Sequence, residues 1–216
     1  MTRAYEEDVR RCIKQAEKHF SKHVALLESV GRDIEVLDFR RPDTVEYALR
    51  VVFDDERGGR VYISGDIGEA VVYPTCKAKL EDMALCFTMR DKNGDLDVRE
   101  GYFLEKVKAT SDRYVWDEES FNADFREHCR EYGIDECVAE DFLTDNMGTF
   151  GGIEICGDSG IRIDGYVTDE IRKIDEDYWE WFFDCGKRID PRIVLWLVGM
   201  RLAWEQIEEV KKAPKE

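Results

Sequence analysis

The stretch that decides the fold runs from residue 45 to 73 and reads VEYALRVVFDDERGGRVYISGDIGEAVVY. Its first part alternates apolar and polar side chains, with the apolar ones at Val45, Tyr47, Leu49, Val51 and Phe53. Successive side chains of a strand point to opposite faces, so this alternation predicts a strand with one buried face. Glycine-containing turns at 57–59 and 65–68 then separate two further apolar runs, 60–64 and 70–73, which predict two more strands.

A long helix is expected ahead of this sheet. Apolar residues recur at three- and four-residue steps from residue 3 to 30, and Gly31 stands where a C-terminal cap belongs. Residues 34–39 supply another strand before the turn at Pro42-Asp43. Together these patterns predict a four-stranded antiparallel meander whose apolar face is covered by the first helix. Gly65 and Gly68 bracket a tight connection, so we expect a positive φ in at least one of them.

Helical patterns dominate after Pro74. Asp190 and Pro191 predict an N-cap and the first position of a last long helix that runs to about Lys212. A short hairpin is expected over residues 153–163, with Gly157-Asp158-Ser159-Gly160 as its turn. The remaining helices are expected at residues 77–89, 99–108, 117–132, 134–143 and 168–174. The fold class is therefore α+β. We expect a single domain, 1–216, with the N-terminal helix and sheet in residues 1–75 and a mainly helical part in residues 76–216.

The composition favours a globular protein in a reducing compartment. Hydrophobic residues make up 43% of the 216, enough for a core without metal or disulfide. The longest apolar run, Ile193 to Met200, is far shorter than the ~20 residues of a membrane span, and no signal peptide is recognisable. Seven cysteines without a C-x-x-C pair favour free thiols. These features predict a cytoplasmic protein that does not act at a membrane.

Acidic residues are concentrated in one part of the sequence. The chain carries 49 acidic and 32 basic residues, a net charge of −17. Residues 112–184 hold 22 acidic and 6 basic side chains, whereas residues 1–111 hold 22 and 19. A field of one sign repels nucleic acid and attracts basic surfaces. We therefore expect a protein partner with a basic surface and no direct nucleic-acid binding. A solvated face that only serves solubility is the alternative.

Seven carboxylates are the candidates for contacting such a partner. They form two groups on two successive helical patterns: Asp117, Glu118 and Glu119 at the start of the first, and Asp135, Glu136, Glu140 and Asp141 on the second. The dipole of a helix favours acidic side chains at its start, so capping also explains the first group. Most members of the second group lie beyond that effect, which makes the second group the sharper candidate.

No catalytic residue is singled out by the sequence. Cys156-Gly157-Asp158-Ser159-Gly160 looks like the nucleophile motif of trypsin-like proteases, and His128-Cys129 echoes their histidine motif. Those enzymes separate histidine and serine by well over a hundred residues, whereas the separation here is 31. A hairpin turn is therefore the better interpretation of the glycine-containing segment.

Two patterns resemble metal sites, but neither is complete, so no metal or other cofactor is expected. His19 and His23 can share a helix face, yet zinc needs three or four ligands. Oxygen-bearing side chains alternate from Asp91 to Asp97 as in a calcium loop. A calcium loop requires glycine at its sixth position and glutamate at its twelfth, but these positions are Leu96 and Tyr102 here. A turn at Asn93-Gly94 is therefore expected instead.

Five aromatic residues crowd the segment from Tyr178 to Phe183. They cannot all face one way on a helix, so some of them are expected at the surface. Packing in the core is the favoured interpretation, and a partner-binding patch is the alternative.

One resemblance to known proteins extends loosely over most of the chain. Residues 60–72, RVYISGDIGEAVV, are similar to a strand-turn-strand segment of uncharacterised accessory proteins of bacterial phages and integrative elements. Residues 101–106, 111–117 and 177–187 also look like this group, whereas the glycine-rich stretch 148–165 departs from it. The resemblance implies an inhibitor of host defence in a bacterial cell, such as an anti-CRISPR protein.

Two functions of different class remain open. The first is a non-enzymatic phage or mobile-element inhibitor whose acidic region occupies the basic nucleic-acid channel of a host nuclease, such as a Cas effector. The second is a small enzyme that acts on a cationic or nucleotide-like substrate through carboxylates. A concave pocket with convergent carboxylates of shifted pKa would favour the enzyme, and a convex acidic surface would favour the inhibitor.

Overall fold

The computed structural model describes residues 3–110, 112–147, 151–157 and 159–213. The chain divides into two compact units. Unit 1 comprises residues 3–113 and 190–216, and unit 2 comprises residues 114–189. Unit 1 is therefore built from two separate stretches of the chain. The boundary expected near residue 75 does not coincide with this division, because residues 76–113 and the last helix belong with the sheet.

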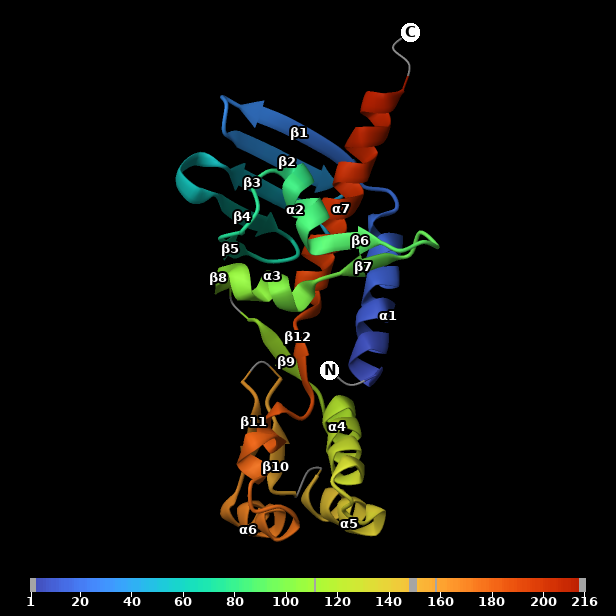
Figure 1. Ribbon diagram of the computed structural model, residues 1–216, viewed down its shortest axis with the longest axis vertical. Helices are drawn as coiled ribbons and strands as arrows, with labels where there is room; N and C mark the ends of the chain where they lie inside the picture. The colour runs from blue at the N-terminus through green and yellow to red at the C-terminus, as the bar shows by residue number, and fades with distance from the viewer. Residues whose placement is uncertain (1–2, 111, 148–150, 158, 214–216) are drawn as a thin grey trace. The chain divides into compact units, whose positions relative to one another are not determined.

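Unit 1 is built on a six-stranded antiparallel sheet (Figure 1). The α+β class is confirmed, but the sheet has six strands where the sequence predicts four. The first five follow one another as a meander, and the sixth comes from a later part of the chain. In sheet order the strands are β1 (Val24–Val30), β2 (Ile34–Arg40), β3 (Leu49–Asp54), β4 (Arg60–Gly65), β5 (Ala70–Val72) and β8 (Val107–Thr110).

The first additional strand comes from a stretch that was expected to be helical. Helix α1 (Arg3–Phe20) ends at Phe20, and the next residues form β1, which pairs with β2 over seven consecutive residue pairs. The expectation of a helix from 3 to 30 is wrong beyond Phe20. Phe20, Val24 and Leu27 satisfy a helical spacing by coincidence, because the burial of β1 alternates with a period of two.

The core of unit 1 lies between the inner face of the sheet and helix α7 (Pro191–Lys212) (Figure 1). Gly199 allows α7 to approach the sheet, because a Cβ atom there would lie 2.8 Å from Cδ2 of Leu49. Helix α1 packs mainly on α7, and it meets the sheet through the ring of Phe20, which contacts Phe39 of β2. The last helix begins as predicted, with the Asp190 carboxylate accepting from the backbone N–H of Arg192 at 2.8 Å.

The turns around β3 and β4 follow the glycine pattern of the sequence. Gly65 and Gly68 have φ of +126° and +110°, which confirms the predicted positive φ. The strand expected from residue 45 begins only at Leu49, because Tyr47 takes a φ of +56° and its N–H donates to the Asp66 carboxylate at 2.9 Å. The rest of unit 1 consists of a 3-10 helix (Glu56–Gly58), α2 (Leu80–Phe87), α3 (Glu100–Lys106) and the hairpin of β6 (Thr88–Arg90) with β7 (Leu96–Val98).

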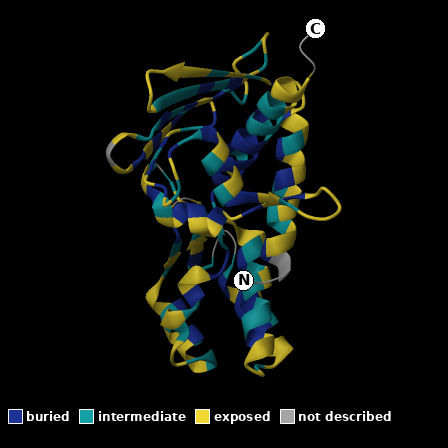
Figure 2. Cartoon of the chain, turned by 45° about the horizontal axis from the view of Figure 1, so that its top comes forward, coloured by how far each residue is buried: buried dark blue, intermediate teal, exposed yellow. Residues whose placement is uncertain are grey.

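Unit 2 has a separate core that is rich in aromatic rings. Phe121, Phe125 and Phe182 are fully buried in it and contact one another. Its helices turn exposed faces outward around this buried interior (Figure 2). The elements are α4 (Glu118–Glu131), α5 (Glu136–Asn146), α6 (Gly165–Ile174), the hairpin of β10 (Ile153–Ile155) with β11 (Ile161–Ile163), the pair of β9 (Tyr114–Trp116) with β12 (Lys187–Ile189), and two 3-10 helices (Tyr178–Glu180 and Phe182–Asp184).

The predicted elements of unit 2 are present with shifts at their ends. The hairpin over residues 153–163 is confirmed, although Asp158 of its expected turn lies outside the described residues, as does Gly148. Asp117 caps α4 as the helical pattern from 117 suggested. Across the described parts of both units, no helix combines the length and the apolar character needed to cross a membrane.

Candidate functional site

Unit 2 carries nearly all of the excess negative charge. Residues 114–189 hold 21 acidic and 7 basic side chains, a net charge of −14 out of the −17 of the whole chain. The acidic stretch seen in the sequence therefore coincides with a compact unit of the fold. A charge of this density in 76 residues produces a potential that acts over about a Debye length, ~10 Å at 0.1 M salt.

Most of the few basic side chains of unit 2 are already engaged within the unit. Six of the seven lie within 3.8 Å of a carboxylate oxygen of unit 2. Each therefore neutralises one carboxylate locally and leaves the others uncompensated. The pairs are Arg126–Glu140, Arg162–Glu154, Arg172–Asp169, Lys173–Glu170, Lys187–Asp184 and Arg188–Asp124.

The first group of candidate carboxylates lies at the start of α4. Asp117 is the N-cap residue, and its Oδ1 accepts from the backbone N–H of Ser120 at 2.8 Å. Glu118 and Glu119 follow in the first turn and are exposed, and neither makes an ion pair within the described part of the chain. Asp117 therefore has a structural role, whereas the other two are available to a partner.

The second group is also divided by the structure. Asp135 caps α5, and its hydrogen bond from the backbone N–H of Cys137 at 3.1 Å lowers the pKa of its carboxyl. Glu140 accepts two hydrogen bonds from the guanidinium of Arg126 at 2.5 and 2.9 Å, which lower its pKa. Glu136 and Asp141 are exposed, and among the described residues neither has a salt-bridge partner. These two are the free carboxylates of the group.

The aromatic segment contains both core and surface residues. Phe182 is fully buried, and Tyr178 and Trp181 are half-buried against the core of unit 2. Trp179 and Phe183 remain exposed, by 59% and 38%. The sequence shows that these rings cannot all share one face. Which rings are exposed depends on the 3-10 geometry of the segment, and this geometry follows only from the tertiary structure.

His128 is packed among aromatic rings of unit 2. Its imidazole stacks on Trp181 at a centroid distance of 3.6 Å and on Tyr132 at 4.3 Å. Its Nε2 lies 3.8 Å from the carboxylate of Asp175, and burial lowers its pKa. The histidine thus packs against the aromatic segment through Trp181.

The two incomplete metal patterns have structural roles. Burial lowers the pKa of His23, whose Nε2 contacts the carbonyl oxygen of Tyr47 at 3.2 Å, and His19 stacks on the ring of Tyr47. The Asp91 carboxylate accepts the backbone N–H groups of Asn93 and Asp95, which confirms the expected turn. Over the described residues, no cluster of three or more histidine, cysteine or acidic side chains could hold a metal ion.

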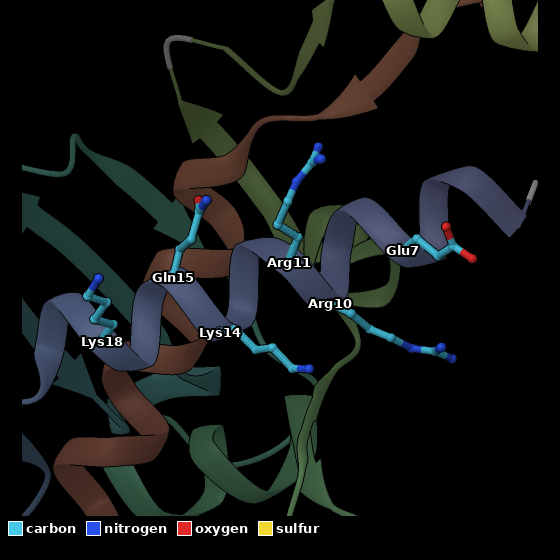
Figure 3. A pocket seen from close by; sticks show the side chains of 6 residues that line it. All are labelled: Glu7, Arg10, Arg11, Lys14, Gln15 and Lys18. Atoms are coloured by element: carbon cyan, nitrogen blue, oxygen red, sulfur yellow. The ribbon is translucent and has the colours of Figure 1, made fainter.

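Unit 1 offers a cavity and a cationic helix face. The cavity, of about 520 Å³, lies between α1 and the β6–β7 hairpin, and its carboxylates Glu17, Asp91, Asp95 and Asp97 are offset by Arg10 and Lys14. The exposed face of α1 carries Arg10, Arg11, Lys14 and Lys18. Figure 3 shows Arg11 and Gln15 leaving the helix on one side and Arg10 and Lys14 on the other. These cations therefore do not converge on one ligand.

Comparison of the chain with protein-family models, curated proteins and solved structures finds no match. The functional hypothesis that follows is based on the uncompensated carboxylates of unit 2.

Proposed function

We propose that the protein is a non-enzymatic inhibitor that binds a basic surface of a nucleic-acid-targeting nuclease through unit 2. The observation that carries this proposal is the net charge of −14 in one compact unit, six of whose seven basic side chains are engaged in internal ion pairs. A partner that places lysines and arginines against this unit gains charge pairs that the fold itself leaves open. The resemblance to accessory proteins of phages and integrative elements supports a target in host defence, such as a Cas effector.

The mechanism follows from charge and competition. A nuclease holds its nucleic acid in a channel lined with basic side chains, and the acidic unit presents carboxylates to the same side chains. Long-range attraction accelerates the encounter, and occupation of the channel then excludes the nucleic acid. No bond is made or broken in this mechanism, so the protein needs no cofactor.

Glu118, Glu119, Glu136 and Asp141 are the residues proposed to contact the partner. All four are exposed, and none has an ion pair within the described residues. Asp117, Asp135 and Glu140 are proposed as supporting residues, because their carboxylates already bind backbone N–H groups or Arg126. Their negative charge still adds to the potential of the unit.

The test compares charge reversal in the two units. The double variant Glu136→Lys/Asp141→Lys changes unit 2, and the matched control Glu28→Lys/Glu209→Lys makes the same change in net charge at exposed positions of unit 1. Each tagged protein is used to capture partners from a bacterial lysate at about 0.05 M and about 0.5 M salt. Each captured nuclease is then assayed for nucleic-acid binding with and without the protein.

We expect the wild-type protein and the control to capture a basic nuclease at low salt and to displace its nucleic acid. The unit 2 variant should lose both effects, and high salt should weaken capture by all three proteins. Equal loss in the control would show that only total charge matters. Full displacement by the unit 2 variant would overturn the proposal.

A further inference from the structure

The aromatic segment of unit 2 has a surface of unusual composition. From residue 176 to 184, each exposed residue is either a carboxylate or an aromatic ring. Trp179 has 59% of its surface exposed and Phe183 has 38%. The exposed residues in this range are Glu176, Asp177, Trp179, Glu180, Phe183 and Asp184.

The exposed rings are carried by an anchored backbone. Phe182 is fully buried against Phe121 and Phe125. The indole N–H of Trp181 donates to the Asp175 carboxylate at 2.8 Å, and that of Trp116 donates to the carbonyl oxygen of Phe183 at 3.2 Å. Trp179 and Phe183 are therefore presented on a well-supported segment, so binding through them costs little ordering entropy.

The neighbouring charges decide which partner this surface fits. Exposed tryptophan is typical of binding hot spots, because a large ring can bury much area in one contact. An apolar partner would have to desolvate Asp177 and Glu180, which have no salt-bridge partner in the described chain, at a cost in free energy. A cationic side chain instead gains from the ring face and from the carboxylates together.

Unit 2 already holds one cation in this kind of environment. The ammonium nitrogen of Lys187 lies 4.7 Å from the ring centroid of Tyr114 and 5.8 Å from that of Trp116. The same nitrogen lies 2.7 Å from the carboxylate of Asp184. Aromatic rings combined with a carboxylate are thus an arrangement that this unit uses for its own lysine.

We propose that Trp179 is an arginine-binding position, on which a guanidinium of the basic partner stacks while Asp177 and Glu180, which flank Trp179 in the sequence, neutralise its charge. The proposal rests on the proposed function and locates one contact of that interface. Arginine is favoured over lysine because its planar guanidinium is weakly hydrated and stacks on aromatic faces, whereas the ammonium of lysine is compact and strongly hydrated.

Two peptides of equal charge separate this contact from general attraction. Blocked hexa-arginine and hexalysine are titrated into the full-length protein at about 0.05 M salt, and the dissociation constants are measured by calorimetry. Two variants remove the ring of Trp179. Trp179→Ala removes the whole side chain beyond Cβ, whereas Trp179→Leu keeps an apolar side chain without a ring face. Tyr166→Ala is the matched control, because Tyr166 is 63% exposed on α6 of the same unit.

The wild-type protein and the control should bind hexa-arginine about two- to fivefold more tightly than hexalysine. Both Trp179 variants should keep the wild-type melting temperature and bind the two peptides equally. Equal affinity of the wild-type protein for both peptides, or an unchanged arginine preference in Trp179→Leu, would overturn the inference. If the inference fails but Glu136→Lys/Asp141→Lys still weakens the binding of both peptides, the proposed function stands without the arginine contact. If neither peptide binds the wild-type protein, both the inference and the proposed function are overturned.

Discussion

The buried ion pair between Asp124 and Arg188 is predicted to be a main source of stability in unit 2. The two side chains are only 13% and 12% exposed, and the Asp124 carboxylate accepts from the Arg188 guanidinium at 2.6 and 3.0 Å. It also accepts from the backbone N–H of Gly186 at 2.9 Å. The pair therefore ties α4 to the segment that leads into β12.

Asp124→Ala removes all three hydrogen bonds and leaves a guanidinium in a poorly solvated position. Breaking a buried pair costs about 3–5 kcal/mol, and the residual exposure here favours the lower end, about 3 kcal/mol. With a slope of about 1.5 kcal/mol per M, the urea midpoint of unit 2 should fall by about 2 M. Circular dichroism during urea titration measures this shift.

The control is the double variant Asp124→Leu/Arg188→Met, which replaces both charges with apolar groups. It should be less destabilised than Asp124→Ala, because no unpaired charge is left inside. A loss below about 1 kcal/mol in Asp124→Ala would refute the reasoning, since it would mean that solvent already screens the pair. A double variant less stable than the single one would refute it as well.

Three further predictions concern pH, backbone geometry and the thiols. Burial lowers the pKa of His128, so the unfolded chain binds its proton at a higher pH than the folded one. Stability should thus fall as pH drops below about 6.5. The variant His128→Phe should therefore show a smaller difference in melting temperature between about pH 7.5 and about pH 5.5 than the wild-type protein. An unchanged difference would contradict this prediction. Gly65→Ala should cost more than about 2 kcal/mol, because φ is +126° and its Cβ atom would lie 2.2 Å from the carbonyl oxygen of Ala48. The control Gly31→Ala, with φ of +73° and open space, should cost about 1 kcal/mol, and equal urea midpoints would exclude the clash. Cys137 is exposed, whereas Cys129 is buried and burial raises its pKa to about 11, so iodoacetamide should label Cys137 before Cys129, as measured by mass spectrometry. Reductant should leave the melting temperature unchanged, and a disulfide-linked peptide recovered under thiol-blocking conditions would contradict this.

Local patterns in the sequence were sufficient for most elements of the fold. The alternation in β3, the glycines at 65 and 68 and the Asp190-Pro191 start of α7 each depend on neighbours in the chain, and each prediction is confirmed. Strand β1 was missed because Val24 and Leu27 continue the helical spacing of the preceding residues, whereas Val24 and Leu26 fit a strand period. Only pairing with β2 decides between the two, and pairing is a tertiary interaction.

The candidate site was predictable to a similar degree. Charge counts located the acidic region, which coincides with unit 2. The counts could not tell that Glu140 is bound by Arg126, because that contact joins α4 and α5 across fourteen residues. The exposure of Trp179 and Phe183 likewise could not be predicted from the sequence, because it depends on the burial of Phe182 in a core assembled from distant segments.

The most direct test of the central claim is a map of where a basic ligand contacts the chain. Hexalysine is joined to the full-length protein with a zero-length carbodiimide reagent, which couples lysine amines to carboxylates in contact. The modified residues are then identified by mass spectrometry. Unit 1 holds 28 acidic residues and unit 2 holds 21, so random contact would favour unit 1. We predict that most cross-links fall within residues 114–189, led by Glu136, Asp141 and Glu180. Cross-links distributed in proportion to the carboxylates of the two units would contradict the account.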